Sequence, residues 1–340
     1  MKAIGFRKPL PIDDANALID LDIPVPQPHG RDLLVKVEAV GVNPVDYKVR
    51  SSAKVEGPDA RILGWDAAGV VAGVGPDAKL FKAGDAVFYA GSIIRPGANS
   101  EYHLVDERIA GRKPQSLDFA AAAAIPLTAI TAWEALFDRL AIDREGGHRD
   151  RAILIVGGAG GVGSIAIQLA AKVAHLKVIA TASRPESAAW CRMQGAHNII
   201  DHFRDMPMQL KTLGFNGVDY ILCLNDTDRH FPAMAEAIAP QGRICSIVET
   251  KGPLDIGALM RKSAGFVWEL MFTRSMFGTA DMIAQHNLLN RVSELIDAGT
   301  LRGTANETLS PINAENLRAA HRKLESGRTV GKIVLAGFPR

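Results

Sequence analysis

The sequence predicts an α/β protein in which a doubly wound parallel sheet is inserted into a β-barrel-like domain. Two observations lead to this fold class. A glycine-rich turn joins an apolar strand to an apolar helix over residues 153–171, and strand and helix patterns alternate after it. Before it, short strands separated by regular turns fill the first hundred residues, which is typical of a compact β domain.

A chain of 340 residues is long for one hydrophobic core, so two domains are expected. We place residues 1–126 plus 277–340 in the β domain and residues 127–276 in the domain of the parallel sheet. A last strand pattern at residues 331–335 returns to the β domain, which makes the second domain an insertion.

The remaining elements follow in chain order. Strands are predicted at residues 2–6, 17–23, 33–40, 63–74, 86–89, 101–105, 177–182, 198–201, 218–224, 243–248 and 266–272. Helices are predicted at residues 43–50, 130–140, 206–212, 229–239, 284–297 and 313–326. Ser116 is expected to cap a further helix that Pro126 ends.

The glycine-rich turn predicts a dinucleotide site. Gly158, Gly160 and Gly163 match G-x-G-x-x-G, in which the first glycine makes the turn, the second admits a pyrophosphate and the third allows close packing of helix and strand. With Gly161 and Val162 at the helix start, these residues would offer backbone N–H groups to the phosphates. The pattern alone is weak, but its position between a strand and a helix strengthens it. The alternative is a glycine turn without a ligand.

The end of the second strand favours NADPH over NADH. A NAD site usually has an acid there, but this strand runs into Ser183-Arg184, with no carboxylate before Glu186. A hydroxyl and a planar guanidinium suit a 2′-phosphate. The alternative is a solvated arginine that starts the next helix. Leu224 and Val248 fall at the carboxyl ends of later strands, where the backbone is expected to line the same site.

Composition excludes several classes. The net charge of +2 has no basic tract, so nucleic acid is not expected as a partner. No apolar run could span a bilayer and the N-terminus lacks a signal-peptide core, so no membrane association is expected. Three cysteines far apart in sequence fit a reduced, cytoplasmic protein. The pattern at 266–272 is expected at an exposed sheet edge, where Trp268 is either a homodimer contact or a core residue.

Motifs along nearly the whole chain resemble the medium-chain dehydrogenase/reductase superfamily. They are the glycine-rich turn, Gly41-Val-Asn-Pro-Val-Asp46, Gly64-Trp-Asp-Ala-Ala-Gly69, Phe81-Lys-Ala-Gly-Asp85, Ile125-Pro-Leu-Thr-Ala-Ile-Thr-Ala-Trp133 and Gly331-Lys-Ile-Val-Leu335. The chain is most similar to quinone oxidoreductase-like proteins, in the branch termed zinc-type alcohol dehydrogenase-like. The resemblance implies a Rossmann NADP-binding domain inserted into a GroES-like catalytic domain.

The resemblance also bears on metal binding. The places of the family's catalytic zinc ligands hold Asn43, Trp65 and Leu127, none of which suits zinc, and Val45 replaces a relay hydroxyl. We therefore expect no metal and a zinc-independent, NADPH-dependent hydride transfer to a quinone or an α,β-unsaturated carbonyl. The alternatives are an alcohol dehydrogenase with atypical zinc ligands and a non-catalytic NADPH-binding sensor.

By the same resemblance, Asn43 is expected beside the nicotinamide, with a strand-ending turn residue as the alternative. Tyr47 is a candidate hydrogen-bond or proton donor to the substrate, or a packing residue. Asp46 and Asp66 are expected to pair with Lys48 or Lys332 in a structural role.

Two further cofactor contacts are expected. Thr128 could reach the nicotinamide or its ribose, or could simply be a threonine at a helix start. His202 takes the place of a tyrosine that helps to hold the adenosine phosphate in quinone oxidoreductases, or is an exposed histidine at a strand end.

Overall fold

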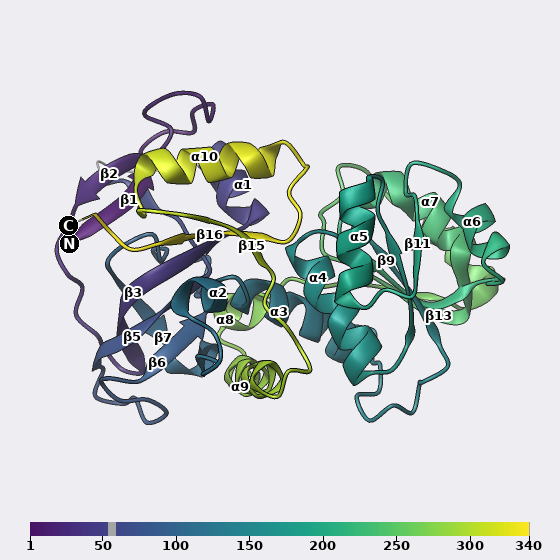
Figure 1. Cartoon of the computed structure of the whole chain (residues 1–340), viewed down its shortest axis with the longest axis horizontal. Coiled ribbons are helices and arrows are strands. Elements are labelled where there is room, and N and C mark those ends of the chain that lie inside the picture. The colour runs from purple at the N-terminus through teal and green to yellow at the C-terminus, as the bar shows by residue number, and fades with distance from the viewer. Residues whose placement is uncertain (54–58, 340) are drawn as a thin grey trace. The chain divides into compact units, whose positions relative to one another are not determined.

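The computed structural model describes residues 1–53 and 59–339. The chain forms two compact units (Figure 1). The first unit combines Met1–Ile130 with Phe272–Arg340, and the second unit is Thr131–Met271. The divisions expected after residues 126 and 276 lie near these. The assignment of a catalytic role to the first unit and an NADP-binding role to the second stays a prediction.

Two sheets form the framework of the first unit, and their strands pair antiparallel except for β15 and β16, which are parallel. In its described part, one sheet has the strand order β2–β1–β4 and a larger one the order β15–β16–β3–β5–β6–β8, with β7 also paired to β3. The long strand β3 pairs with β5, β7 and β16, so it joins segments from both ends of the chain. The strands are β1 (Lys2–Phe6), β2 (Ile19–Asp22), β3 (Asp32–Val42), β4 (Arg61–Ile62), β5 (Ala67–Val74), β6 (Ala86–Tyr89), β7 (Tyr102–Asp106), β8 (Ala110–Arg112), β15 (Ala305–Leu309) and β16 (Lys332–Ala336).

The helices of the first unit correct two predictions. They are α1 (Pro44–Ser52), the 3-10 turn η1 (Glu107–Ile109), α2 (Phe119–Ala123), α3 (Pro126–Trp133, which runs across the division), α8 (Thr273–Phe277), α9 (Ala284–Asp297) and α10 (Ala314–Glu325). Asp118, not Ser116, caps α2 through the N–H of Ala121, because the Ser116 hydroxyl donates to Asp297 instead. Pro126 starts a helix as well as ending one, since proline fits the first turn, where its missing N–H costs nothing.

The second unit is a parallel sheet with the strand order β11–β10–β9–β12–β13–β14. The order steps outward from β9 to β11 and then reverses to β12, so the topological switch of a doubly wound fold lies between β9 and β12. The predicted Rossmann sheet is thus confirmed. The strands are β9 (Ala152–Val156), β10 (Lys177–Thr181), β11 (Asn198–Ile200), β12 (Val218–Cys223), β13 (Ile238–Ser246) and β14 (Gly265–Trp268).

Helices cover both faces of this sheet: α4 and α5 lie on one side of the strands and α6 and α7 on the other (Figure 1). Apolar side chains of the strands, such as Leu154 and Ile221, form one core cluster with Phe231 and Met234 of α7. The helical segments are the π-helical η2 (Glu134–Arg139), α4 (Gly161–Gln168), the π-helical η3 (Leu169–Val173), α5 (Pro185–Gln194), α6 (Met206–Thr212), α7 (Thr227–Ala237) and the 3-10 segment η4 (Ile256–Lys262). None of the helices in the described residues has the length and apolar character needed to cross a membrane.

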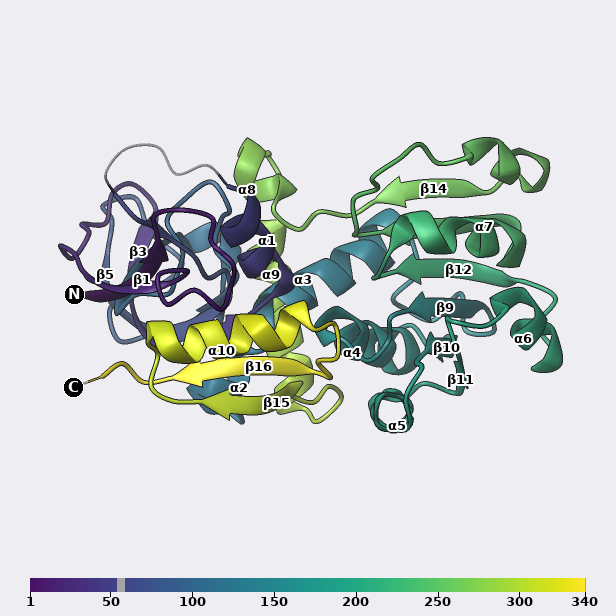
Figure 2. The same cartoon turned by 90° about the horizontal axis from the view of Figure 1, so that it is seen from above.

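The sheet ends at β14, which is shorter than predicted and has one edge that no other described strand covers, as seen from above in Figure 2. Trp268, at its end, is 46% exposed, so the core-packing alternative for this residue is wrong.

A buried pair of carboxyl groups links η2 to the segment after β14. Glu134 and Glu269 are both buried, and both lie beside Arg139. Nε of Arg139 lies 2.8 Å from Oε2 of Glu269. One guanidinium compensates one buried negative charge, so the pair retains a proton. Burial, and next the nearby Glu134, raise the pKa of Glu269 to about 9, while Arg139 opposes the rise.

Replacing Glu269 by glutamine is therefore expected to flatten the pH dependence of stability. In the folded protein Glu269 keeps its proton up to about pH 9, whereas its ordinary pKa is 4.5. Between these values the folded state holds the extra proton, so wild-type stability falls as pH rises. The amide has no proton to lose, so the thermal midpoint of the variant should gain on wild type with rising pH. Glu236→Gln, at an exposed position in the same unit, is the control. Parallel profiles of wild type and Glu269→Gln would contradict the shared proton.

Candidate active site

The turn after β9 has the geometry that a dinucleotide site requires, with one correction. The left-handed backbone, with φ of 85°, belongs to Gly157 and not to Gly158, to which the sequence assigned the turn. Gly158 is needed for a different reason. A Cβ there would lie 2.8 Å from Cβ of Ala180 and 3.1 Å from Sγ of Cys191, so only glycine lets the turn lie against β10 and α5.

Gly160 and Gly163 differ in what surrounds them. A Cβ on Gly163 would lie 2.5 Å from the carbonyl oxygen of Gly158, so this glycine lets α4 pack on the turn, as its place in the motif predicts. A Cβ on Gly160 would meet nothing closer than 3.9 Å. Gly160 therefore has an open side, which leaves room for a ligand to approach its backbone. Gly161 and Val162 are half-buried in the first turn of α4.

A threonine and a histidine brace the turn from the neighbouring strands. The hydroxyl of Thr181, at the end of β10, accepts the N–H of Gly157 at 2.9 Å and lies 3.0 Å from Nδ1 of His202, just after β11. Burial lowers the pKa of His202, so its imidazole is neutral at pH 7. His202 is half-buried and bonded, not a free residue at a strand end; its contact with the adenosine phosphate stays a prediction.

Ser183 and Arg184 follow β10, as predicted. Ser183 is exposed, and Arg184 is the cap residue of α5. The Arg184 guanidinium forms an ion pair with Glu186, with Nε 2.9 Å from Oε1. The first acid after the strand thus folds back onto the arginine and competes with any phosphate for it.

Leu224 and Val248 lie where the carboxyl ends of β12 and β13 meet. The N–H of Leu224 donates to Val156, and the carbonyl oxygen of Val248 accepts the hydroxyl of Thr227 at 2.6 Å. The same hydroxyl lies 2.6 Å from that of Ser246. These bonds hold the carboxyl ends of β12 and β13 in place, at the same ends of the strands as the glycine turn.

The first unit holds a buried polar cluster of Asn43, Asp66 and Lys332. Asn43 follows β3, Asp66 precedes β5, and Lys332 is the first residue of β16. The register pairs Ile333 with Val42, which brings Lys332 beside Asn43. Lys332 Nζ lies 2.5 Å from Asn43 Oδ1, 2.8 Å from Asp66 Oδ2 and 3.0 Å from the carbonyl oxygen of Val42. Nδ2 of Asn43 donates to the same oxygen of Asp66 at 2.9 Å. Lys332 is therefore the partner of Asp66 among the two lysines expected from the sequence.

The surrounding backbone is tied to this cluster. The N–H of Leu127 donates to Oδ1 of Asp66 at 2.8 Å. A Cβ on Gly41 would lie 2.3 Å from the carbonyl oxygen of Ala123, so only glycine lets β3 approach α2 here. Burial raises the pKa of Asp66, while the ammonium of Lys332 and the N–H of Leu127 oppose the rise.

Asp46, in the first turn of α1, accepts the backbone N–H of the cap residue Asn43 at 2.6 Å. It is fully buried, and burial raises its pKa to about 7, against the opposing effects of the Asn43 N–H and of Lys332. The carboxyl group of Asp46, next to the cluster, therefore gains and loses its proton near neutral pH.

The other two predicted residues of the first unit differ in what they offer a ligand. Tyr47 is half-buried in α1, and burial, followed by the charge of Glu325, raises the pKa of its phenol, so it stays protonated at neutral pH. Thr128 is buried, and its hydroxyl donates to the carbonyl oxygen of Ile125 at 2.9 Å. That bond is the local role of a helix-start threonine; the predicted cofactor contact of Thr128 is not tested.

The residues at the place of the family's zinc ligands do not fit a zinc ion. Asn43 already accepts from an ammonium, the indole N–H of Trp65 donates to Ser92 at 3.1 Å, and the Leu127 side chain has no donor atom. Zinc takes nitrogen, sulfur or oxygen ligands from Cys, His, Asp and Glu. Over residues 1–53 and 59–339, no group of three or more such side chains could hold a metal ion.

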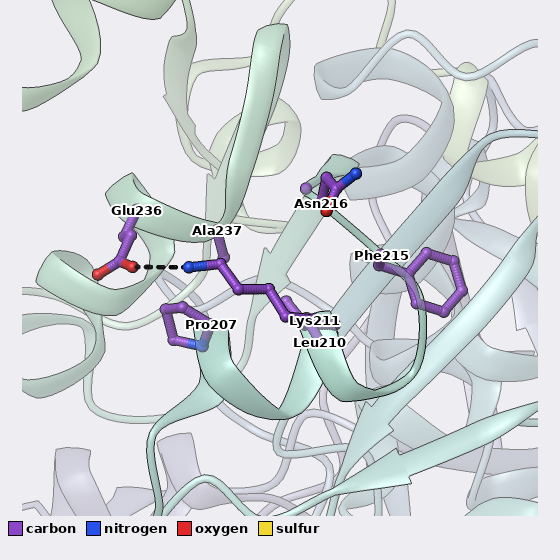
Figure 3. A pocket seen from close by; sticks show the side chains of 8 residues that line it. Pro207, Leu210, Lys211, Phe215, Asn216, Glu236 and Ala237 are labelled. Carbon is purple, nitrogen blue, oxygen red and sulfur yellow. Dashed lines mark ion pairs between the residues drawn. The ribbon is translucent and has the colours of Figure 1, made fainter.

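A surface pocket of about 200 Å³ lies elsewhere on the second unit. Figure 3 shows Lys211 and Glu236 facing one another across it, 4.0 Å apart, with Pro207 below. Gly217, which lines this pocket, directly precedes β12, so the pocket lies at the amino end of the parallel strands. The glycine turn lies at the carboxyl ends of the strands. The pocket is therefore at the opposite ends of the strands and is no part of the predicted cofactor site.

Comparison with known proteins identifies the family. The profile "Alcohol dehydrogenase GroES-like domain" matches residues 29–115, and "Zinc-binding dehydrogenase" matches residues 194–335. A zinc-type alcohol dehydrogenase-like protein of Staphylococcus epidermidis is 39% identical over 98% of this chain and 99% of its own length. A quinone oxidoreductase of Lama guanicoe is 32% identical over 70% of this chain and 69% of its own. A 2-methylene-furan-3-one reductase of Solanum lycopersicum is 26% identical over 94% and 76%.

Solved structures agree. A candidate zinc-dependent alcohol dehydrogenase protein from Rhizobium etli superposes with a TM-score of 0.96 at 54% identity, covering 100% of this chain and 99% of the other. The Escherichia coli quinone oxidoreductase complexed with NADPH superposes with a TM-score of 0.82 at 26% identity, covering 99% and 100%.

The fold and these relatives define an oxidoreductase of the dehydrogenase/reductase type. The chain belongs to the medium-chain dehydrogenase/reductase superfamily, in its quinone oxidoreductase-like branch. Two relatives carry zinc in their names, whereas the donor set around Asn43 in this chain does not suit zinc.

Sequence reasoning missed three features of the site. The strand pattern that contains Thr181 does not indicate that its hydroxyl bonds the glycine turn. The position of Glu186 after the strand does not indicate that it pairs with Arg184. Lys332 was one of two possible partners of an aspartate, and its contact with Asn43 was not foreseen. The available signal for Lys332 was a lone charge at the start of an apolar strand.

Proposed function

We propose that this protein is a zinc-independent, NADPH-dependent reductase of quinones or α,β-unsaturated carbonyl compounds. The observation that carries the proposal is the cluster at Asn43, where a lysine ammonium, and no metal-binding set, faces the asparagine and the aspartate. In a zinc-dependent alcohol dehydrogenase the metal is the Lewis acid that stabilises the alkoxide, whereas a quinone or enone is already electrophilic and accepts a hydride without such activation. The quinone oxidoreductase and furanone reductase relatives support this class of acceptor.

In this proposal the second unit binds the cofactor, which supplies a hydride when bound. The open side of Gly160 receives the pyrophosphate, and the N–H groups of Gly161, Val162 and Gly163 face it at the start of α4. Ser183 and Arg184 hold the 2′-phosphate, with His202 beside the adenosine. The NADPH-bound quinone oxidoreductase relative supports this choice of cofactor.

The first unit supplies the groups that face the acceptor. Asn43, held by Asp66 and Lys332, lies at the nicotinamide and orients the reacting partners. Tyr47 keeps its phenolic proton at neutral pH and donates a hydrogen bond or the proton to the acceptor oxygen.

Incubating the purified protein with NADPH and a panel of quinones, enones and simple ketones tests the proposal by the loss of reduced nicotinamide absorbance. Turnover of quinones or enones with no response to chelators is expected. Oxidation of primary alcohols with NAD that depends on stoichiometric zinc would refute the proposal. Binding of NADPH without turnover of any acceptor would favour a sensor.

Replacing Glu186 by glutamine is expected to tighten NADPH binding severalfold. Glu186 is 63% exposed and pairs with Arg184, so its carboxylate competes with the 2′-phosphate for the guanidinium and also repels it. Binding of NADPH and NADH is measured by fluorescence titration. NADH serves as the control, because it lacks the 2′-phosphate. Tighter NADH binding in the variant, with NADPH unchanged, would contradict the predicted roles of both residues.

We also propose that two copies pair through β14 to form a homodimer. No strand among the described residues pairs with the outer edge of β14, and Trp268 and Leu270 beside it are 46% and 50% exposed. Trp268→Glu should shift the mass measured by light scattering from that of a dimer to that of a monomer. The variant should still unfold in one cooperative thermal transition, as a folded monomer does. A wild-type protein that is monomeric at micromolar concentration would contradict the proposal.

A further inference from the structure

We propose that Lys332 is a positioning residue that, together with Asp66, holds the amide of Asn43 in one of its two orientations. The inference rests on the proposed function for its kinetic consequence and on the cluster itself for its geometry.

The chemistry of the two partners decides the orientation. An ammonium group only donates hydrogen bonds, so the Asn43 atom 2.5 Å from Lys332 Nζ is the carbonyl oxygen. A carboxylate only accepts, so the Asn43 atom 2.9 Å from Asp66 is the amide nitrogen. Turning the amide over would place two donors together on one side and two acceptors together on the other. The ammonium of Lys332 and the carboxylate of Asp66 therefore determine which way the neutral amide of Asn43 is turned.

Asp66 has no freedom to adapt to a turned amide. Its Oδ2 already accepts from Lys332 and Asn43, and its Oδ1 accepts from the N–H of Leu127. Every group that faces this carboxylate in these bonds is a donor, which agrees with an ionised Asp66. All three residues are at most 3% exposed, so water does not replace these partners.

The contacts with Lys332 and Asp66 determine which hydrogen-bonding groups of Asn43 are still available to a ligand. One amide hydrogen is donated to Asp66, and the carbonyl oxygen accepts from Lys332. In the capping box of α1 the N–H of Asp46 also faces the Asn43 side chain. The second amide hydrogen is therefore the group that these bonds leave for a ligand, in a direction that the other contacts fix. Lys332 acts on the reaction only through this arrangement, because its ammonium hydrogens are directed to Val42, Asn43 and Asp66.

The test is the double variant Asp66→Asn/Lys332→Met, which removes both charges together and so avoids leaving one buried charge alone. It is compared with wild type by thermal midpoint, NADPH affinity and steady-state kinetics with NADPH and 1,4-naphthoquinone. We expect kcat to fall about tenfold to hundredfold, because Asn43 can now turn over, with the NADPH dissociation constant changing much less. Full retention of kcat in the folded double variant would overturn the proposal.

A second background separates positioning from general damage. In Asn43→Ala there is no amide to orient, so the same two substitutions should lower kcat by less than about twofold. An equal loss in both backgrounds would overturn the proposal. Arg31→Met/Glu107→Gln removes another ion pair of the first unit with a fully buried glutamate, and it should leave kcat unchanged.

A readout that needs no turnover keeps this inference separate from the proposed function. In protein labelled with ¹⁵N-asparagine, the side-chain amide signal of Asn43 is identified by its loss in Asn43→Ala. It should shift and exchange its hydrogens faster in Asp66→Asn/Lys332→Met. An unchanged signal would overturn the positioning role, whereas a wild-type protein that reduces no acceptor would overturn only the proposed function.

Discussion

Replacing Arg184 by alanine is expected to weaken NADPH binding about tenfold to hundredfold while NADH binding barely changes. A hydrogen bond to a charged group contributes about 1.5–3 kcal/mol, and each 1.4 kcal/mol is about a factor of ten in affinity. The guanidinium is already paired with Glu186 in the structure, so the net effect is expected toward the lower end. Titration of both nucleotides with the purified variant measures the ratio directly.

Arg192→Ala provides the control, because Arg192 is exposed in the last turn of the same helix, α5. It should leave both affinities unchanged. Equal weakening of NADPH and NADH by Arg184→Ala would show that Arg184 supports the helix start rather than the 2′-phosphate, and the preference for NADPH would then be wrong.

Alanine at Gly160 and alanine at Gly163 are expected to fail in opposite ways. At Gly163 the new Cβ would lie 2.5 Å from the carbonyl oxygen of Gly158 and 2.7 Å from that of Gly157, and backbone cannot move aside as a side chain can. Such overpacking costs about 1–3 kcal/mol or more, so the thermal midpoint should fall. At Gly160 the Cβ has room and φ is −73°, so the free protein should keep its stability.

Cofactor affinity separates the two further. The methyl of Gly160→Ala lies on the open side where the pyrophosphate is proposed to approach, so NADPH and NADH should both bind at least about tenfold more weakly. Calorimetry gives the thermal midpoint of each variant, and titration gives its affinity for NADPH and NADH. A stable Gly160→Ala protein with wild-type affinity would remove the glycine turn from the cofactor site.

The fold was largely predictable because its signals are local. The uncharged run before Gly157, the glycine spacing and the later alternation of strand and helix are each contained in a short window, and the parallel sheet follows from them. The boundaries that failed depend on competition between neighbours. Ser116 resembles a cap, but Asp297, far along the chain, takes its hydroxyl, and Asp118 caps α2 instead.

The candidate site was predictable only where one segment carries the chemistry. Gly160, Gly163 and Arg184 could be located because each belongs to a spacing rule along one strand–turn–helix unit. The contact between Asn43 and Lys332 could not, because it depends on the antiparallel register of β3 and β16, which no local pattern encodes. The folding back of Glu186 onto Arg184 is likewise a side-chain choice that spacing leaves open.

The split of the first unit sets an order of events during synthesis on the ribosome. The second unit is one continuous stretch, Thr131–Met271, and can fold as soon as it has emerged. The N-terminal part of the first unit, although made earlier, must wait for β16, the last strand of the described chain, because until then Asp66 has no ammonium to bury against. We therefore expect the second unit to fold before the first, and a chain that ends just before Lys332 to contain a folded second unit and an incomplete first unit.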